Sequence, residues 1–165
     1  QKEWTSIANT MLAEEIVGNP GKPYYNNFKG KRPESAAEVK AVLKLVKEID
    51  PQISVTYHST GKIIYWNYLQ TGSRYHHDYA LAKQLSKMTG YSLVYPRGIP
   101  SGGGFTDWFV HKLKRLGFTI EISRYYYETN PPFSEFPDVW RENRRSDYLL
   151  HAKARSCINK NSLIR

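Results

Sequence analysis

Apolar residues recur at helical spacing in several stretches of the chain and alternate or cluster in shorter runs between them. The helical pattern predicts helices over 4–17, over 35–49 behind the capping-box pattern Ser35-Ala-Ala-Glu38, and over 78–88, 106–116 and 138–152. The shorter runs predict strands over 53–57, 62–68, 91–95 and 118–122. A glycine-rich loop over 96–104 and a proline-rich loop over 130–137 separate the later elements.

Strands that alternate with helices predict an α/β fold with a doubly wound sheet, mixed or largely parallel. At 165 residues the chain is about the size of one domain, so we expect one domain over 1–165 that ends in a basic helical tail over 138–165. In such sheets, ligand-binding residues lie at the carboxyl ends of strands. Tyr57-His58-Ser59-Thr60-Gly61 follows the first strand, and Glu121 lies near the end of the strand over 118–122.

The net charge of the chain bears on its binding partners and not on its fold. The chain carries a formal net charge of +9, with a pI near 9.6, which attracts anionic polymers, nucleic acids or membranes. No zinc-finger spacing or other nucleic-acid-binding module accompanies the charge, so we expect no specific nucleic-acid partner. No apolar run approaches the roughly 18 residues of a membrane span. Cys157 is the only cysteine, which excludes an intrachain disulfide.

His58 is a candidate metal ligand, because it follows an apolar strand and precedes a Ser-Thr-Gly turn that would hold its imidazole at the sheet edge. The competing interpretation is a strand-end histidine that is hydrogen-bonded to backbone. None of the histidines begins a His-x-x-Glu or His-Glu-x-x-His pattern, so the spacing does not assemble a three-ligand zinc site within this chain. The adjacent pair His76 and His77 is expected at the surface.

Glu121 is a candidate general base, because it lies in the otherwise apolar stretch Gly-Phe-Thr-Ile-Glu-Ile. Burial would raise its pKa, which suits a group that accepts a proton from a water molecule. The strand also alternates, with Thr119, Glu121 and Ser123 between apolar neighbours. A glutamate on the solvent side of an edge strand therefore stays open as an alternative.

The order of these motifs resembles the second half of the zinc metallocarboxypeptidases, the carboxypeptidase A-like family. It resembles most the bacterial branch that cleaves γ-D-glutamyl-diaminopimelate bonds in cell-wall peptides. The segments that carry the resemblance are Asn-Phe-Lys-Gly at 27–30, Pro-Glu-Ser-Ala-Ala-Glu-Val at 33–39, Tyr-His-Ser-Thr-Gly at 57–61, Ser-Gly-Gly-Gly-Phe-Thr-Asp-Trp at 101–108 and Phe-Thr-Ile-Glu-Ile at 118–122. The match covers about residues 1–143.

The resemblance implies a zinc carboxypeptidase-type sheet and a peptidase that uses one zinc ion. His58 corresponds to the last zinc ligand of the family, and Glu121 corresponds to the base that activates the metal-bound water. The family's remaining ligands, in a His-x-x-Glu segment, precede the matched part. An arginine that polarises the scissile carbonyl and an Asn-Arg pair that grips the substrate carboxylate precede it as well. We therefore expect a domain that is incomplete at its N-terminus and that needs a missing segment or self-association.

The substrate contacts that the resemblance implies depart from the family pattern at one position. Ser59, Thr60, Tyr95, Thr106 and Asp107 are the candidate substrate-binding residues. The position of the family's substrate-capping tyrosine falls on Ile99, and Tyr95 is the nearest tyrosine before it. Thr106 corresponds to a position in the specificity pocket, where its small polar side chain favours a polar substrate group over a bulky aromatic one.

The function expected from sequence is zinc-dependent hydrolysis of a peptide, with cell-wall peptides as candidate substrates. The positive charge favours a secreted or cell-wall-associated location over a cytoplasmic one. Two alternatives stay open. One is a non-catalytic basic domain that binds anionic polymers, and the other is an aspartoacylase-like amide hydrolase with the same metal layout.

Overall fold

A computed structural model describes residues 22, 34, 36–95, 104–127 and 129–162 of the chain. Its elements are α2 Ala37–Ile49, β1 Ile53–Ser59, β2 Ile63–Tyr65, α3 Gly72–Thr89, β3 Ser92–Leu93, α4 Phe105–Lys112, β4 Leu116–Ile122, the 3-10 helix η2 Phe133–Glu135, α5 Phe136–Asn143 and α6 Ser146–Ser162. The predicted helix over 4–17, the segment over 27–30 and residues 96–103 of the glycine-rich loop lie outside the described residues.

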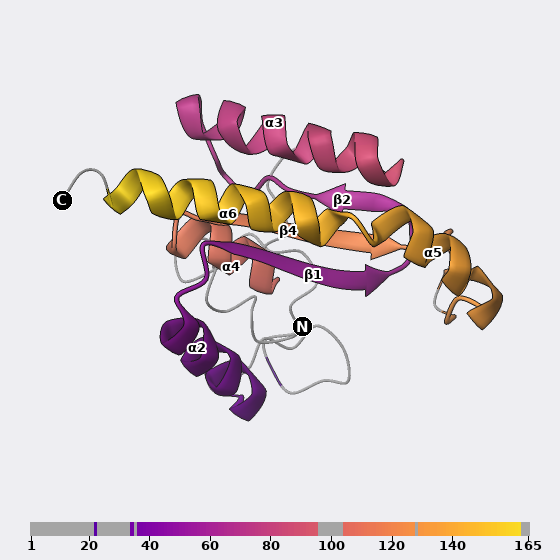
Figure 1. Cartoon of the computed structure of the whole chain (residues 1–165). Coiled ribbons are helices and arrows are strands. Elements are labelled where there is room, and N and C mark those ends of the chain that lie inside the picture. The colour runs from indigo at the N-terminus through magenta and orange to yellow at the C-terminus, as the bar shows by residue number, and fades with distance from the viewer. Residues whose placement is uncertain (1–21, 23–33, 35, 96–103, 128, 163–165) are drawn as a thin grey trace.

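The described strands form one mixed sheet in the order β1-β4-β2-β3. β1 and β4 are parallel, β4 and β2 are antiparallel, and β2 and β3 are parallel. Helices α3 and α6 lie on one side of the sheet and α4 lies on the other, with α2 beyond it (Figure 1). The predicted α/β class, with helices on both faces of a mixed sheet, is confirmed.

Alternation along β4 decides what each face of the sheet contacts. Leu116, Phe118 and Ile120 are buried on the face that packs against Leu85 of α3 and Leu150 of α6. The intervening residues of β4 face α4 instead, because successive side chains of a strand point to opposite faces. Full burial of side chains of this size contributes about 1.5–3 kcal/mol each, so this core accounts for much of the stability of the sheet.

Gly117 lies on the opposite face of β4, where α4 packs closest. A Cβ atom at this position would lie 2.8 Å from Cγ2 of Val110 and 3.2 Å from Cγ2 of Thr106. Val110 is completely buried and cannot move aside freely. The glycine therefore sets how closely α4 approaches the sheet. The prediction that Gly117 separates a helix from a strand was wrong, since it lies inside the strand.

Other element boundaries also differ from the predicted ones. β2 ends at Tyr65, and Leu116 starts β4 instead of ending the preceding helix. α3 begins six residues before the predicted helix over 78–88, at Gly72. Its first turns are held by Arg74, whose guanidinium donates to the carbonyl of Val110 at 2.7 Å. This is a tertiary contact that the local pattern does not contain.

α2 begins at Ala37, two residues after the start of the predicted helix over 35–49. Ala36 occupies the N-cap position and makes no side-chain capping bond, and Ser35 lies outside the described residues. The helix ends at Asp50, which adopts a left-handed conformation and pairs with Arg115 at 2.6 Å. The end of α2 is thereby tied to the residue that immediately precedes β4.

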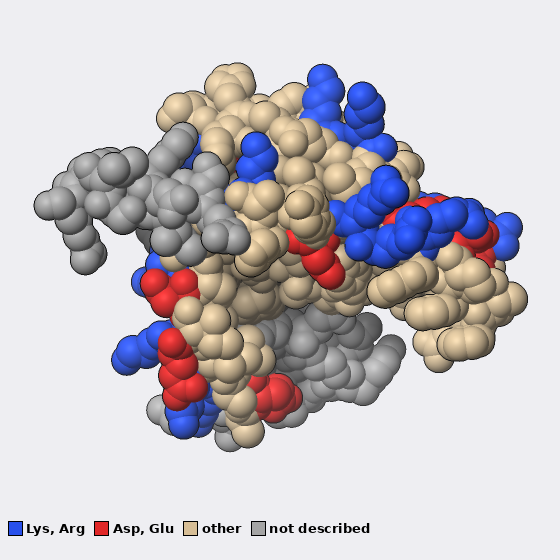
Figure 2. Space-filling view, viewed as in Figure 1, with Lys and Arg blue, Asp and Glu red and all other residues tan. Residues whose placement is uncertain are grey.

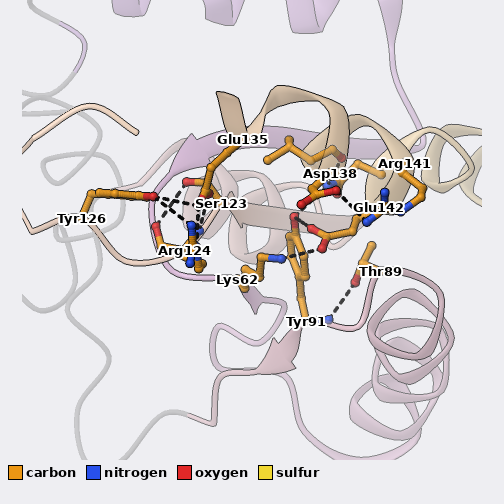
Figure 3. Close-up of polar contacts among 12 residues, drawn as sticks. Lys62, Thr89, Tyr91, Ser123, Arg124, Tyr126, Glu135, Asp138, Arg141 and Glu142 are labelled. Atoms are coloured by element: carbon orange, nitrogen blue, oxygen red, sulfur yellow. Dashed lines mark hydrogen bonds and ion pairs between the residues drawn. The ribbon is translucent and has the colours of Figure 1, made fainter. Parts of the chain in front are cut away.

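The predicted single helix over 138–152 is two helices, α5 and α6, with a break at Arg144 and Arg145. Glu142 of α5 accepts from Lys62 at 2.5 Å and from the Tyr91 hydroxyl at 2.8 Å (Figure 3). Asn143 donates to the same hydroxyl at 2.9 Å. These bonds fasten the end of α5 to the residues that immediately precede β2 and β3.

Basic side chains gather over α5 and the region beside it, with acidic side chains among them (Figure 2). Arg141 pairs with Asp138 at 2.7 Å, and both side chains are largely exposed. Exposed pairs of this kind contribute little to stability. In the described part of the chain, no helix combines the length and the apolar character needed to cross a membrane.

Replacing Gly117 with alanine is expected to destabilise the protein by about 1–3 kcal/mol, because the added methyl group overpacks the interface between α4 and β4. Thermal or urea unfolding measures the loss. Gly104→Ala is the matched control, since its Cβ would meet the nearest atom, Oδ2 of Asp107, at 3.4 Å. A loss for Gly117→Ala no larger than that of the control would contradict the packing argument.

Candidate functional site

The parallel pairing of β1 and β4 brings the two main candidate residues together. His58 is the register partner of Glu121, and Thr56 and Thr119 form the preceding pair on the same face. Both candidates lie near the carboxyl ends of their strands, where the general rule for open α/β sheets places ligand sites. His58 and Glu121 are half-buried, so both retain access to solvent.

Glu121 opens into a depression of about 400 Å³ at this end of the sheet, called here the Glu121 depression. Its lining residues are Ser59, Thr60, Gly61, Ile63, Tyr65, Glu121, Tyr125 and Tyr127. Three tyrosines in this set offer ring faces, and the glutamate is the only acidic group among the lining residues. The depression therefore combines one carboxylate with three tyrosines and with the small residues of the segment after β1.

Burial raises the pKa of Glu121 above its ordinary value, and the nearby His58 works in the opposite direction. The pKa of Tyr65 is also raised, first by burial and then by the charge of Glu121. Tyr65 consequently stays a neutral phenol. A partly desolvated carboxylate with a raised pKa is a stronger proton acceptor than a fully exposed one, which suits a group that accepts a proton from water.

Ser59 ends β1 and Thr60 follows it, and both line the depression. Thr60 Oγ1 accepts the backbone N–H of Tyr126 at 3.0 Å, and the N–H of Gly61 donates to the carbonyl of Ser123 at 3.1 Å. Gly61 has φ of 148°, a conformation that side chains rarely adopt. The turn after β1 thus supports the loop after β4, and both contribute to the depression.

Thr106 lies below the candidate site in a cluster of three hydroxyl groups. Its Oγ1 lies 2.7 Å from that of Thr119 and 3.2 Å from that of Thr56. Thr106 is buried, and it is not among the residues that line the Glu121 depression. A role for Thr106 in substrate binding stays a prediction.

Asp107, next to Thr106, lies in the first turn of α4. One of its carboxylate oxygens accepts the backbone N–H of Gly104 at 3.2 Å, which completes the start of the helix. Burial raises the pKa of Asp107 to about 6, against the effect of that hydrogen bond. These contacts account for Asp107 as a capping residue of α4, and its predicted contact with substrate is not tested by them.

Tyr95 follows β3 at the other side of the sheet. Its hydroxyl donates to that of Tyr79 at 3.3 Å, and its ring meets that of Trp66 edge-on at 6.2 Å between centroids. It does not line the Glu121 depression. The structure therefore groups Tyr95 with aromatic residues of α3, and its predicted contact with substrate stays a prediction.

The described residues do not complete a zinc site. A catalytic zinc ion is held by three protein ligands. No group of three or more His, Cys, Asp or Glu side chains comes together among residues whose positions the structure describes. His58 and Glu121 fit one ligand and one base, so any zinc site would need donors from elsewhere in the complete protein.

Sequence reasoning missed the aromatic lining of the depression. Tyr65 lines the depression because β2 pairs antiparallel with β4. This pairing places Ile63 opposite Glu121 and Tyr65 opposite Thr119. Tyr125 and Tyr127 enter through the loop after β4. The run of three tyrosines at 125–127, only a few residues after Glu121, could have predicted that Tyr125 and Tyr127 lie near the candidate base. Tyr65 could not be placed without the strand order.

Comparison with known proteins identifies the family. A family model described as zinc carboxypeptidase matches residues 4–146, which is most of the chain. The chain belongs to the zinc carboxypeptidase family. This confirms the resemblance found in the sequence, and it makes His58 and Glu121 the residues to test first.

Two curated relatives of this zinc carboxypeptidase chain are bacterial. The uncharacterized protein YqgT of Bacillus subtilis is 31% identical over 139 residues, covering 84% of this chain and 35% of the relative. Gamma-D-glutamyl-L-diamino acid endopeptidase 1 of Lysinibacillus sphaericus is 27% identical over 129 residues, covering 78% and 31%. The chain therefore spans about a third of the length of the curated relatives it matches.

Solved structures support the same fold. Murein-tripeptide amidase MpaA from Escherichia coli O157 matches with a TM-score of 0.50 and 21% identity, over 73% of this chain and 44% of that one. Thrombin activatable fibrinolysis inhibitor matches with a TM-score of 0.55 and 21% identity, over 87% and 39%. At this level of identity the two structures establish the fold alone.

The buried Asp107 predicts a dependence of stability on pH. Folding raises its pKa from 3.8 to about 6, so the folded state binds a proton between these values that the unfolded state releases. Stability should therefore fall as pH rises through this window. Asp107→Asn removes the charge and keeps an acceptor for the N–H of Gly104. The free energy of unfolding of this variant, relative to that of the native protein, should therefore be roughly 2 kcal/mol higher at pH 7 than at pH 4.

Urea unfolding of both proteins at pH 4 and pH 7 measures this gain. Asp138→Asn, at an exposed position of α5, is the control. An equal stability difference between native and Asp107→Asn protein at the two pH values would contradict the prediction.

Proposed function

We propose that the complete protein is a zinc-dependent peptidase that hydrolyses an amide bond in a peptide, with bacterial cell-wall peptides as the favoured substrates. The observation that carries the proposal is the register pairing of His58 and Glu121 near the carboxyl ends of two parallel strands, where Glu121 lines the Glu121 depression and His58 does not. Family membership and the peptidase names of the relatives support it.

In this proposal, His58 is one ligand of the zinc ion, and further ligands come from parts of the complete protein outside the described residues. Bound zinc would polarise the scissile carbonyl and lower the pKa of water, which is the chemistry that the metal supplies in zinc peptidases. His58 fits this role because its position beside Glu121 holds the ligand and the base at the same end of the sheet.

Glu121 acts as the general base and then as the general acid. Its carboxylate accepts a proton from the attacking water and delivers that proton to the leaving nitrogen when the C–N bond breaks. The raised pKa of Glu121 supports this exchange, because a more basic carboxylate accepts the proton more readily. Tyr65, held neutral beside it, can donate a hydrogen bond to the substrate.

Replacing Glu121 with glutamine in the complete, zinc-loaded protein should lower kcat by about 10²–10⁴-fold, because the amide cannot accept the proton. Hydrolysis of a γ-D-glutamyl-diaminopimelate peptide measures the loss. Glu48→Gln, at an exposed carboxylate of α2, is the control and should retain native activity. Undiminished hydrolysis by the Glu121→Gln protein would rule out the proposed mechanism. Preferential cleavage of small acylated amino acids would instead support the aspartoacylase-like alternative.

His58 can be tested by metal content as well as activity. His58→Ala should lose bound zinc, because a site that lacks one of its ligands binds the ion more weakly. His76→Ala, at an exposed histidine of α3, should keep the native zinc content. Elemental analysis after dialysis measures both. Zinc retained in full by the His58→Ala protein would show that this histidine is not a ligand.

A second candidate function is the binding of anionic polymers, favoured by the formal charge of +9 and by the exposed residues Arg144, Arg145 and Lys153. Such binding would weaken steeply as salt is raised, because each neutralised charge releases counterions. Titration with teichoic-type polymer at two salt concentrations measures it. Binding that is absent or indifferent to salt would exclude this candidate.

A further inference from the structure

The loop after β4 carries two exposed tyrosines at the edge of the Glu121 depression. Tyr125 and Tyr127 are 64% and 81% exposed, and their ring centroids lie 4.9 Å apart with the planes tilted by 56°. Both rings line the depression that Glu121 also lines. Exposed aromatic pairs beside a concave site provide large contact areas at a small loss of conformational entropy.

The residues between and before these tyrosines hold the loop in place. Arg124 donates to Glu135 from its backbone N–H at 3.1 Å and from Nε at 2.5 Å, and the Tyr126 hydroxyl donates to Oε1 of Glu135 at 2.7 Å (Figure 3). The backbone N–H of Tyr126 donates to Thr60 in addition. We call Arg124, Tyr126 and Glu135 the Glu135 clamp.

The clamp separates the loop residues into two sets by alternation. Arg124 and Tyr126 bind Glu135, whereas Tyr125 and Tyr127 meet at the rim of the depression. The hydrogen bond from Tyr126 leads the contacts that lower the pKa of Glu135 to about 2, so the carboxylate stays ionised over the pH range of a working enzyme. The hydrogen bonds of the Glu135 clamp, which join Arg124 and Tyr126 to this carboxylate, are therefore available at any such pH.

Among the described residues of this loop, 123–127, the charged side chain is that of Arg124, and its guanidinium is paired with Glu135, so Tyr125 and Tyr127 present ring faces at the rim. A ring face carries partial negative charge and attracts the weakly positive hydrogens of C–H groups. The surface therefore fits a C–H-rich face of a ligand better than it fits a phosphate or a carboxylate. Electrostatic binding of a polyanion would instead use the exposed Arg144 and Arg145, which lie between α5 and α6.

We infer that Tyr125 and Tyr127 form a substrate-binding rim that stacks on a C–H-rich face of the substrate next to the bond cleaved at Glu121, with Glu135 as its positioning residue. This inference rests on the proposed function and names a part of the same site. Cell-wall peptides offer such faces from two sources. One is an aliphatic side chain of the peptide, and the other is the sugar ring to which the peptide is attached.

The test uses the complete, zinc-loaded protein with Tyr125 and Tyr127 both replaced by alanine. We expect KM for a cell-wall peptide to rise about tenfold or more with kcat nearly unchanged, which marks the loss of binding that is uniform between ground state and transition state. Substrates with and without the disaccharide separate the two sources. A rise confined to the sugar-linked substrate assigns the rim to the sugar, and an equal rise for both assigns it to the peptide.

Tyr148→Ala is the matched control, because this tyrosine of α6 is as exposed as Tyr127 and does not line the depression. It should leave both kinetic constants unchanged. Unchanged KM values for both substrates in the double variant would overturn the inference, provided that the native protein is active. A KM change equal to that of the control would overturn it as well.

Glu135 provides an independent test of positioning. Glu135→Ala should raise KM in the same direction as the double tyrosine variant, and Glu135→Gln should restore part of the affinity because an amide oxygen still accepts from Tyr126. A KM that Glu135→Ala leaves at the native value would show that the clamp does not position the rim.

Binding to the Glu121→Gln protein keeps the inference separate from the proposed mechanism. Calorimetric titration of this variant with the sugar-linked peptide should give an affinity that falls about tenfold when both tyrosines are also replaced. That fall would uphold the rim even if Glu121→Gln proved fully active and the proposed mechanism failed. Equal affinities with and without the tyrosines would reject the rim even if the mechanism held.

Discussion

The parallel pairing of β1 with β4 is the interaction on which the rest of this structure depends. It joins segments about 60 residues apart and aligns them so that His58 meets Glu121. The same alignment brings Thr56 against Thr119 beneath them, where Thr106 of α4 adds a third hydroxyl. A shift of one residue would turn Glu121 toward the apolar face that packs on α3, so the core that fixes the register also fixes the site.

Packing on the two faces of β4 serves different purposes. The face toward α3 and α6 is apolar and completely buried at Phe118 and Ile120, and it supplies the burial that stabilises the sheet. The face toward α4 has small and polar residues, with Gly117 below and Glu121 at the open end. Small and polar residues on this face let α4 pack closely against β4 while Glu121, at the end of β4, keeps access to solvent.

Much of this could be predicted from the sequence, because strand and helix periodicity and the order of short motifs are local properties. The α/β class, the placement of His58 and Glu121 at strand ends and the family followed from them. Element limits were less predictable where tertiary contacts decide them, as at Gly72, where α3 is extended by the hydrogen bond between Arg74 and the Val110 carbonyl. Tyr65 joined the site through an antiparallel pairing that no local pattern encodes. Contacts of substrate with Tyr95, Thr106 and Asp107 remain predictions.

The Glu135 clamp has a consequence for how this site could diversify. Successive side chains of this short loop make different contacts. Arg124 and Tyr126 bind Glu135, whereas Tyr125 and Tyr127, the residues of the proposed rim, do not. Substitutions at positions 125 and 127 would then leave the loop's backbone hydrogen bonds to Thr60 and Glu135 intact. Selection can alter the chemical preference of the rim one residue at a time without passing through unfolded intermediates, which makes this loop a natural place for related enzymes to diverge.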